Sequence, residues 1–206
     1  MYRYKVSLFF RPEETGIEAY NNVHFTLTYL FKLGAKPEKT VLGVPFYGHT
    51  FQLKDSDNSR LASPAESFSF KGKYTGTDGF LGYNEICEYL KDPNHRWTIV
   101  FGKYYQAPYM FREEHWIGYD DERSIRRKTE FAYDQRLAGV MIWSIDTDDF
   151  TGNCFGVKFP LLRAINNALY RKVNGLPNKS AGAISSPISV KLILAVVIFT
   201  LCYYKS

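Results

Sequence analysis

Two short runs of apolar residues constrain the fold of this chain more than any other feature. They are Val41-Leu-Gly-Val-Pro-Phe46 and Leu137-Ala-Gly-Val-Met-Ile-Trp-Ser-Ile145. Such continuous runs are typical of strands that are buried on both faces, as in a parallel sheet. Each run follows a segment with helical spacing, at residues 17–33 and 121–133, and a closing helix is predicted over 159–169. The sequence therefore predicts repeated helix–strand units and an α/β fold.

Residues 50–118, between these units, have a different character. They contain turn signals such as Thr75-Gly-Thr-Asp-Gly79 and many aromatic residues. One short helix is predicted at 82–91, and strands that are expected to pair antiparallel are predicted at 97–101 and 107–111. The segment is therefore expected to be an α+β insertion.

Charge and aromatic content limit the classes of partner. The chain has 26 Lys and Arg residues against 21 Asp and Glu residues, a net charge of +5. The basic residues are scattered, and the longest run is Arg126-Arg-Lys128, so no nucleic-acid partner is expected. Aromatic residues make up 17% of the chain, and their rings can serve as flat platforms for sugars or bases.

The two ends of the sequence give conflicting signals about location. The first residues lack the apolar stretch of about 7–15 residues that a secretory signal needs. Residues 192–204 are an apolar run of 13 residues, preceded by the small residues Ser180-Ala-Gly182 and a polar spacer. This is the layout of a glycosylphosphatidylinositol anchor signal, and a short tail anchor or a buried terminal helix are the alternatives. An anchor requires a secretory route, so we expect that N-terminal sequence precedes Met1.

The end of the second apolar run and the residues after it contain the candidate functional side chains. Trp143 stands at the carboxyl end of that run, where it can stack on a sugar ring or pack in the core. Asp146, Asp148 and Asp149 form either a metal cluster or a loop of acids that caps helices. The four histidines show no metal-ligand spacing, so neither a metal nor a cofactor is predicted.

Several motifs in one order resemble a known family. Val41–Gly48, Thr77-Asp-Gly-Phe-Leu-Gly-Tyr-Asn-Glu-Ile-Cys87, Trp116-Ile-Gly-Tyr-Asp-Asp121 and Gly139–Phe150 look like the carboxyl-terminal part of glycoside hydrolase family 18, the chitinases and chitinase-like proteins. The resemblance implies a partial TIM (β/α)8 barrel, with only the last two strands and their helices, and an inserted α+β domain. Val41–Tyr47 would be the seventh strand and 140–145 the eighth.

The resemblance also implies how the chain is divided. The expected parts are a barrel part at 1–49, an α+β insertion domain at 50–118, a second barrel part at 119–172, a linker at 173–191 and a C-terminal hydrophobic tail at 192–204.

The same resemblance assigns roles to individual residues. Trp143 would be the floor under the sugar, and Tyr47 would line the groove. His49 stands where the family usually has Arg, which can contact the sugar or a groove carboxylate. Phe80, Trp116 and Tyr119 would wall the groove, with core packing as the alternative for these three.

Two further features concern the secretory route, and the first of them is implied by the resemblance. Cys87 and Cys154 would form a disulfide, which implies an oxidising compartment. Asn178-Lys-Ser180 is a glycosylation sequon. The protein is therefore expected to be extracellular or at the cell surface.

The family's catalytic run, Asp-x-x-Asp-x-Asp-x-Glu, is absent from this sequence. The resemblance implies a full-length protein that binds chitin or N-acetylglucosamine oligosaccharides and hydrolyses β-1,4 links by a substrate-assisted retaining mechanism. This chain is expected to be inactive alone, because it lacks the catalytic Glu. One alternative is a non-catalytic chitinase-like lectin or growth-factor-type protein, and another is a structural remnant without a ligand.

Overall fold

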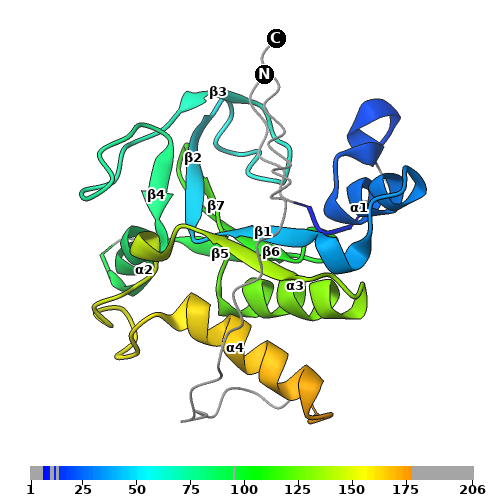
Figure 1. Cartoon of the computed structure of the whole chain (residues 1–206). Coiled ribbons are helices and arrows are strands. Elements are labelled where there is room, and N and C mark those ends of the chain that lie inside the picture. Colours follow the sequence, from blue (N-terminus) through cyan, green and yellow to red (C-terminus); the bar gives the residue numbers. More distant parts are fainter. Residues whose placement is uncertain (1–6, 10–11, 13, 95, 178–206) are drawn as a thin grey trace.

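The computed structural model describes residues 7–9, 12, 14–94 and 96–177. The two apolar runs form β1 (Val41–Pro45) and β8 (Gly139–Trp143), which pair in parallel as a two-stranded sheet. Helices α3 (Glu122–Asp134) and α4 (Pro160–Val173) lie side by side below these strands in Figure 1. The predicted strand and helix pairs are therefore present, with the parallel pairing that continuous apolar runs favour.

A second sheet of six strands is formed within residues 47–118, and every strand pair in it is antiparallel. Its strand order is β3-β2-β7-β6-β5, and β4 pairs with β2. Helix α2 (Tyr83–Lys91) follows β4 directly. The strands of this sheet are β2 (Tyr47–Leu53), β3 (Ala65–Phe68), β4 (Phe80–Gly82), β5 (Thr98–Gly102), β6 (Ala107–Arg112) and β7 (His115–Gly118).

The first predicted strand ends earlier than expected. Val41–Tyr47 was expected to be one strand, but β1 stops at Pro45 and Tyr47 begins β2. The Phe46 N–H donates to the carbonyl of Trp143, and the Phe46 carbonyl accepts from Tyr83 N–H. Phe46 therefore joins the two sheets, and it directs Tyr47 and His49 into the larger one.

The segment at 17–33 is shorter as a helix than its apolar spacing predicts. A 3₁₀ turn covers Gly16–Tyr20, and α1 begins only at Val23 and ends at Lys32. The Asn22 side chain accepts from the Phe25 N–H at 2.8 Å, which caps the helix at this point. Two further 3₁₀ turns cover Pro37–Lys39 and Ile145–Thr147.

One main hydrophobic core extends across both sheets. It includes fully buried side chains from the residue between β1 and β2, from α2, from β6 and β7, and from α3 and α4. These are Phe46, Ile86, Met110, Ile117, Ile125 and Leu161. The larger sheet and the parallel strands therefore share apolar packing, which fixes one against the other.

A buried ion pair lies within this packing. The ammonium of Lys128 on α3 contacts the carboxylate of Asp120, which follows β7, at 2.6 Å, and the two side chains are 2% and 1% exposed. A buried charge that loses its partner is costly, so each of these residues depends on the other.

Several predicted features fall outside the described residues. The tail at 192–204, the glycosylation sequon at Asn178 and nearly all of the linker lie beyond residue 177. Among the helices of the described ranges, none is both long and apolar enough to span a bilayer.

We predict that Asp120→Ala lowers the free energy of unfolding by about 3–5 kcal/mol, because it leaves Lys128 charged and buried without its partner. Asp134 is the matched control, since its pair with Lys172 is exposed, and Asp134→Ala is expected to cost about 0–1 kcal/mol. Urea unfolding of the two variants measures the difference. Equal losses of unfolding free energy in the two variants would show that the buried pair does not contribute more to stability than the exposed pair.

Candidate functional site

Trp143 is the exposed residue of β8. It is the last residue of the strand and lies opposite Pro45 of β1. Its side chain is 56% exposed, whereas the four residues before it are partly buried. The peptide bond to Ser144 is cis. A large apolar ring is therefore accessible at the carboxyl end of a parallel strand, the end at which α/β folds place their ligands.

Three other predicted site residues lie together at the start of the larger sheet. His49 on β2 is opposite Phe80 on β4. The Tyr47 ring stacks on the Phe80 ring with centroids 4.7 Å apart, and the His49 ring lies 5.4 Å from Tyr47 and 6.1 Å from Phe80. We call these three residues the aromatic cluster. Tyr47 of this cluster directly follows Phe46, whose N–H donates to the carbonyl of Trp143.

The imidazole ring of His49 is neutral, and its Nδ1 donates a hydrogen bond. Its Nδ1 lies 2.9 Å from the carbonyl oxygen of Gly79, and because a carbonyl only accepts, Nδ1 carries a proton. Burial lowers the pKa of His49 below its usual value of 6.5, although the bond to Gly79 acts in the opposite direction. The residue therefore presents a neutral ring at neutral pH, where an Arg would present a fixed charge.

Trp116 and Tyr119 lie apart from the aromatic cluster. Trp116 is 4% exposed, packs against Tyr109 and Phe51 at centroid distances of 5.2 and 6.0 Å, and donates from Nε1 to the Ser59 carbonyl. Tyr119 is 2% exposed, and burial raises the pKa of its hydroxyl. The structure thus places both residues in packed interior positions, as in the packing alternative, and brings neither to the surface of a groove.

Two of the three acids after Trp143 hold the backbone. Asp148 accepts from the N–H groups of Leu161 and Leu162, and so caps the first turn of α4. Burial raises the pKa of Asp148, and these hydrogen bonds offset part of that increase. The helix-capping interpretation is therefore confirmed for Asp148.

Asp149 organises the loop that follows. It accepts from the Thr151 hydroxyl and from the N–H groups of Gly152, Asn153 and Cys154. Burial acts to raise the pKa of Asp149, but these hydrogen bonds outweigh it and leave the pKa below its usual value. A carboxylate that is saturated in this way has little capacity left for a metal ion.

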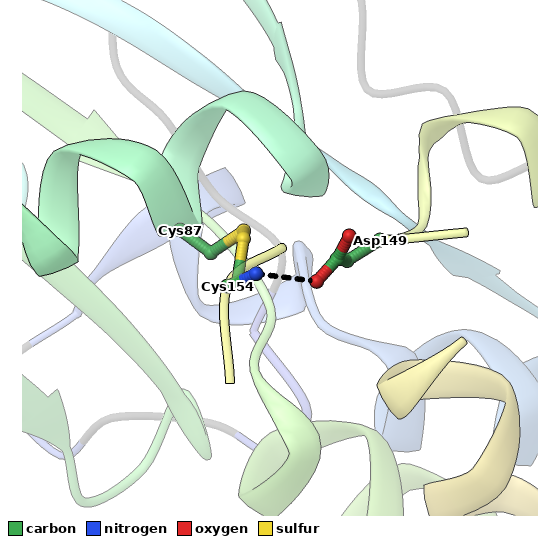
Figure 2. Close-up of side chains that lie close together, drawn as sticks. All are labelled: Cys87, Asp149 and Cys154. Carbon is green, nitrogen blue, oxygen red and sulfur yellow. Dashed lines mark hydrogen bonds between the residues drawn. A yellow bond between two sulfur atoms is a disulfide. The ribbon is translucent and has the colours of Figure 1, made fainter. Parts of the chain in front are cut away.

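The expected disulfide between Cys87 and Cys154 is present. It joins α2 to the loop after β8, with the two Cα atoms 5.7 Å apart (Figure 2). In Figure 2 the Asp149 carboxylate accepts from the Cys154 N–H at 2.8 Å. These three residues come close enough to be considered as metal ligands, but both sulfurs are in the disulfide and Asp149 holds the loop. The group is a structural brace between α2 and the loop after β8.

Comparison with known proteins agrees with this geometry. The model of the family described as Glycosyl hydrolases family 18 matches residues 4–148. A relative named Probable chitinase 2, from Drosophila melanogaster, is 42% identical over an alignment of 182 residues that covers 75% of this chain and 37% of that protein. The chain belongs to glycoside hydrolase family 18.

Other members of family 18 are similar in sequence or in structure. Chitinase-3-like protein 2 of Homo sapiens is 37% identical over 158 residues, which cover 76% of this chain and 39% of that protein. The crystal structure of the Ostrinia furnacalis Group IV chitinase superposes with a TM-score of 0.76 at 37% identity, and covers 82% of this chain and 46% of that chain. YKL-39, solved in the presence of chitooligosaccharides, superposes with a TM-score of 0.74 at 36% identity, with coverages of 80% and 44%. The chain thus spans less than half the length of these family 18 proteins.

Glu85 is a site-forming residue that the sequence analysis missed. Its carboxylate is 2% exposed and accepts from the N–H groups of Tyr74, Thr75 and Gly82 and from the Thr75 hydroxyl. These bonds fix the loop that leads into Phe80. A capping-box spacing, with Gly82 at the N-cap of α2 and Glu85 three residues later, is the signal that indicates this role.

We predict that Glu85→Ala destabilises the protein by about 1–3 kcal/mol or more, because several buried donors lose their acceptor. Glu88 is the matched control on the next turn of α2, where Glu88→Ala is expected to stay within about 0.5 kcal/mol. Thermal unfolding of both variants is the measurement, and similar losses would contradict the role of Glu85.

The lowered pKa of His49 predicts a loss of stability in acid. The folded protein binds the His49 proton less readily than the unfolded chain does, so this contribution is present above about pH 6.5 and is lost as the pH falls below that value. His49→Gln is expected to reduce the slope of unfolding free energy against pH in this range. NMR titration should give a His49 midpoint below 6.5, and a midpoint at or above 6.5 would contradict the assignment.

Proposed function

We propose that this chain supplies the floor and part of the wall of a groove that binds chitin or N-acetylglucosamine oligosaccharides. Trp143 is the floor, and Tyr47, His49 and Phe80 are the wall beside it. The single observation that carries this proposal is the 56% exposure of Trp143 at a strand end where a packed residue would be buried. An indole face can stack on the apolar face of a pyranose ring.

The relatives support an oligosaccharide as the ligand. YKL-39 is described as a pseudo-chitinase with retained chitooligosaccharide binding properties. The Ostrinia furnacalis Group IV chitinase has also been solved in complex with allosamidin, with a TM-score of 0.77 at 37% identity. These two structures cover 80% and 85% of this chain.

The fold proposal follows from the same likeness. We infer that β1 and β8 are the last two strands of a (β/α)8 barrel and that the antiparallel sheet with α2 is its insertion. The two parts of the fold then have different roles. The strand ends present Trp143 to the ligand, while the insertion holds the aromatic cluster at the edge of the groove.

Within this proposal the chain binds and orients a sugar but performs no proton transfer. The acid run of the family is absent from the sequence, and two of the three acids after Trp143, Asp148 and Asp149, hold backbone N–H groups. A full-length protein with the catalytic Glu would hydrolyse the β-1,4 link, whereas one without it would only bind the oligosaccharide. The likeness to YKL-39 favours this second, lectin-like candidate, and the likeness to the insect chitinases favours the first.

An extracellular or cell-surface location is part of the same proposal. The disulfide between Cys87 and Cys154 supports it, because disulfides persist in oxidising compartments. A membrane or lipid anchor in the tail, and glycosylation at Asn178, remain proposals that rest on the sequence alone.

Trp143→Ala tests the proposed floor. We predict that it weakens chitotetraose binding by about 2 kcal/mol, or roughly thirtyfold in Kd, because a central aromatic contact is lost. Isothermal titration calorimetry with chitotetraose measures the affinity, because its signal does not depend on the replaced indole.

Trp116→Phe is the control for this experiment, because it changes a buried indole and keeps most of the packing. It is expected to leave the affinity unchanged. Unaltered binding in Trp143→Ala, or an equal loss in both variants, would contradict the proposed floor.

A further inference from the structure

A pocket that the proposed groove does not use lies between two segments far apart in the sequence. Its volume is about 400 Å³, within the range of about 300–1,000 Å³ typical of small-molecule sites. One wall contains Tyr74 from the loop before β4, with Asn84 and Glu88 from α2, and the other contains Asp146, Phe150 and Asn153 from the segment after β8. We call this the acidic pocket.

Covalent and hydrogen bonds fix the two walls relative to each other. The disulfide between Cys87 and Cys154 joins them, and the Lys91 ammonium donates to the Asn153 carbonyl at 2.7 Å. On the first wall, the Tyr74 hydroxyl donates to Glu88 at 2.9 Å and the Tyr74 N–H donates to the buried Glu85. A pocket formed in advance loses little entropy when a ligand binds.

The chemistry of the lining favours a cation. Three of the residues that line the pocket are acids and none is basic. Asp149 is saturated by the hydrogen bonds described above, but Glu88 and Asp146 are exposed, and no described residue donates a hydrogen bond to the Asp146 carboxylate. The Lys73 ammonium lies over the Tyr74 ring, 5.1 Å from its centre, so one face of this ring is engaged by a cation of the chain itself.

The aromatic rings favour a sugar as the carrier of that cation. Tyr74 and Phe150 are 55% and 46% exposed, and they offer apolar surfaces to a pyranose ring. The amides of Asn84 and Asn153 can hydrogen-bond to its hydroxyl groups. A small cation alone would not use the apolar surfaces.

The acidic pocket and the proposed groove contain residues that are close together along the chain. Asp146 follows Trp143 by three residues, in the 3₁₀ turn Ile145–Thr147, and the Thr147 hydroxyl closes this turn by donating to the Ser144 carbonyl at 2.7 Å. The position of Asp146 is therefore fixed close to Trp143 along the backbone.

We propose that the acidic pocket binds a glucosamine unit through its free ammonium group, and so selects partly deacetylated chitin oligosaccharides. This rests on the proposed function, because the groove would hold the neighbouring N-acetylated units. Glu88 and Asp146 pair with the ammonium, and Tyr74 and Phe150 contact the sugar ring.

The double variant E88Q/D146N tests this proposal with two probes, tetraglucosamine and chitotetraose. Calorimetry at a pH where the amine is protonated is expected to show that the variant binds tetraglucosamine about fivefold or more weakly than the unaltered chain does. Chitotetraose affinity is expected to stay the same, because its acetylated nitrogens are uncharged. Added salt should weaken tetraglucosamine binding to the unaltered chain, since exposed charges are screened.

The control E38Q/E66Q removes the same charge from exposed acids that do not line the pocket. It should leave both affinities unchanged. Failure of the unaltered chain to bind tetraglucosamine, equal affinity in E88Q/D146N, or an equal loss in E38Q/E66Q would overturn the proposal. Loss of chitotetraose binding by the unaltered chain would instead contradict the proposed groove, so the two failures are distinguishable.

Discussion

The parallel pairing of β1 with β8 is the interaction on which the candidate site depends. It places Trp143 opposite Pro45, and the next residue, Phe46, donates its N–H to the Trp143 carbonyl while its own carbonyl accepts from Tyr83. One backbone position therefore connects the parallel strands, the antiparallel sheet and the start of α2. The backbone of Trp143 and the start of β2, which carries Tyr47 and His49, are adjacent because the chain passes from one sheet to the other at this point.

Buried acids give this arrangement its rigidity. Asp148 caps α4, Asp149 holds the loop to Cys154, and Glu85 holds the loop before Phe80. Their carboxylates are occupied by backbone donors, so they support the site and do not act as free acids or metal ligands. Two acids near the same region, Glu88 and Asp146, remain exposed and give it a negative surface.

The sequence predicts the elements that have a strong apolar pattern and misses the strands that lack one. Continuous apolar runs and amphipathic spacing identify β1, β8, α3 and α4, and the motifs that resemble family 18 identify the disulfide. The strands β3, β4 and β7 have only three or four residues, and β2, although it has seven, contains no continuous apolar run. Many side chains of β2, β4 and β7 are buried by neighbours that only the folded chain provides. For the same reason the motif around Trp116 gives its place along the chain but not its exposure, which depends on Phe51 and Tyr109 from other strands.

A crystal structure of the chain soaked with chitotetraose is the most direct test of the central claim. The account predicts a pyranose ring lying against the indole face of Trp143, with Tyr47, His49 or Phe80 beside it. A bound oligosaccharide that contacts neither Trp143 nor the aromatic cluster would contradict it.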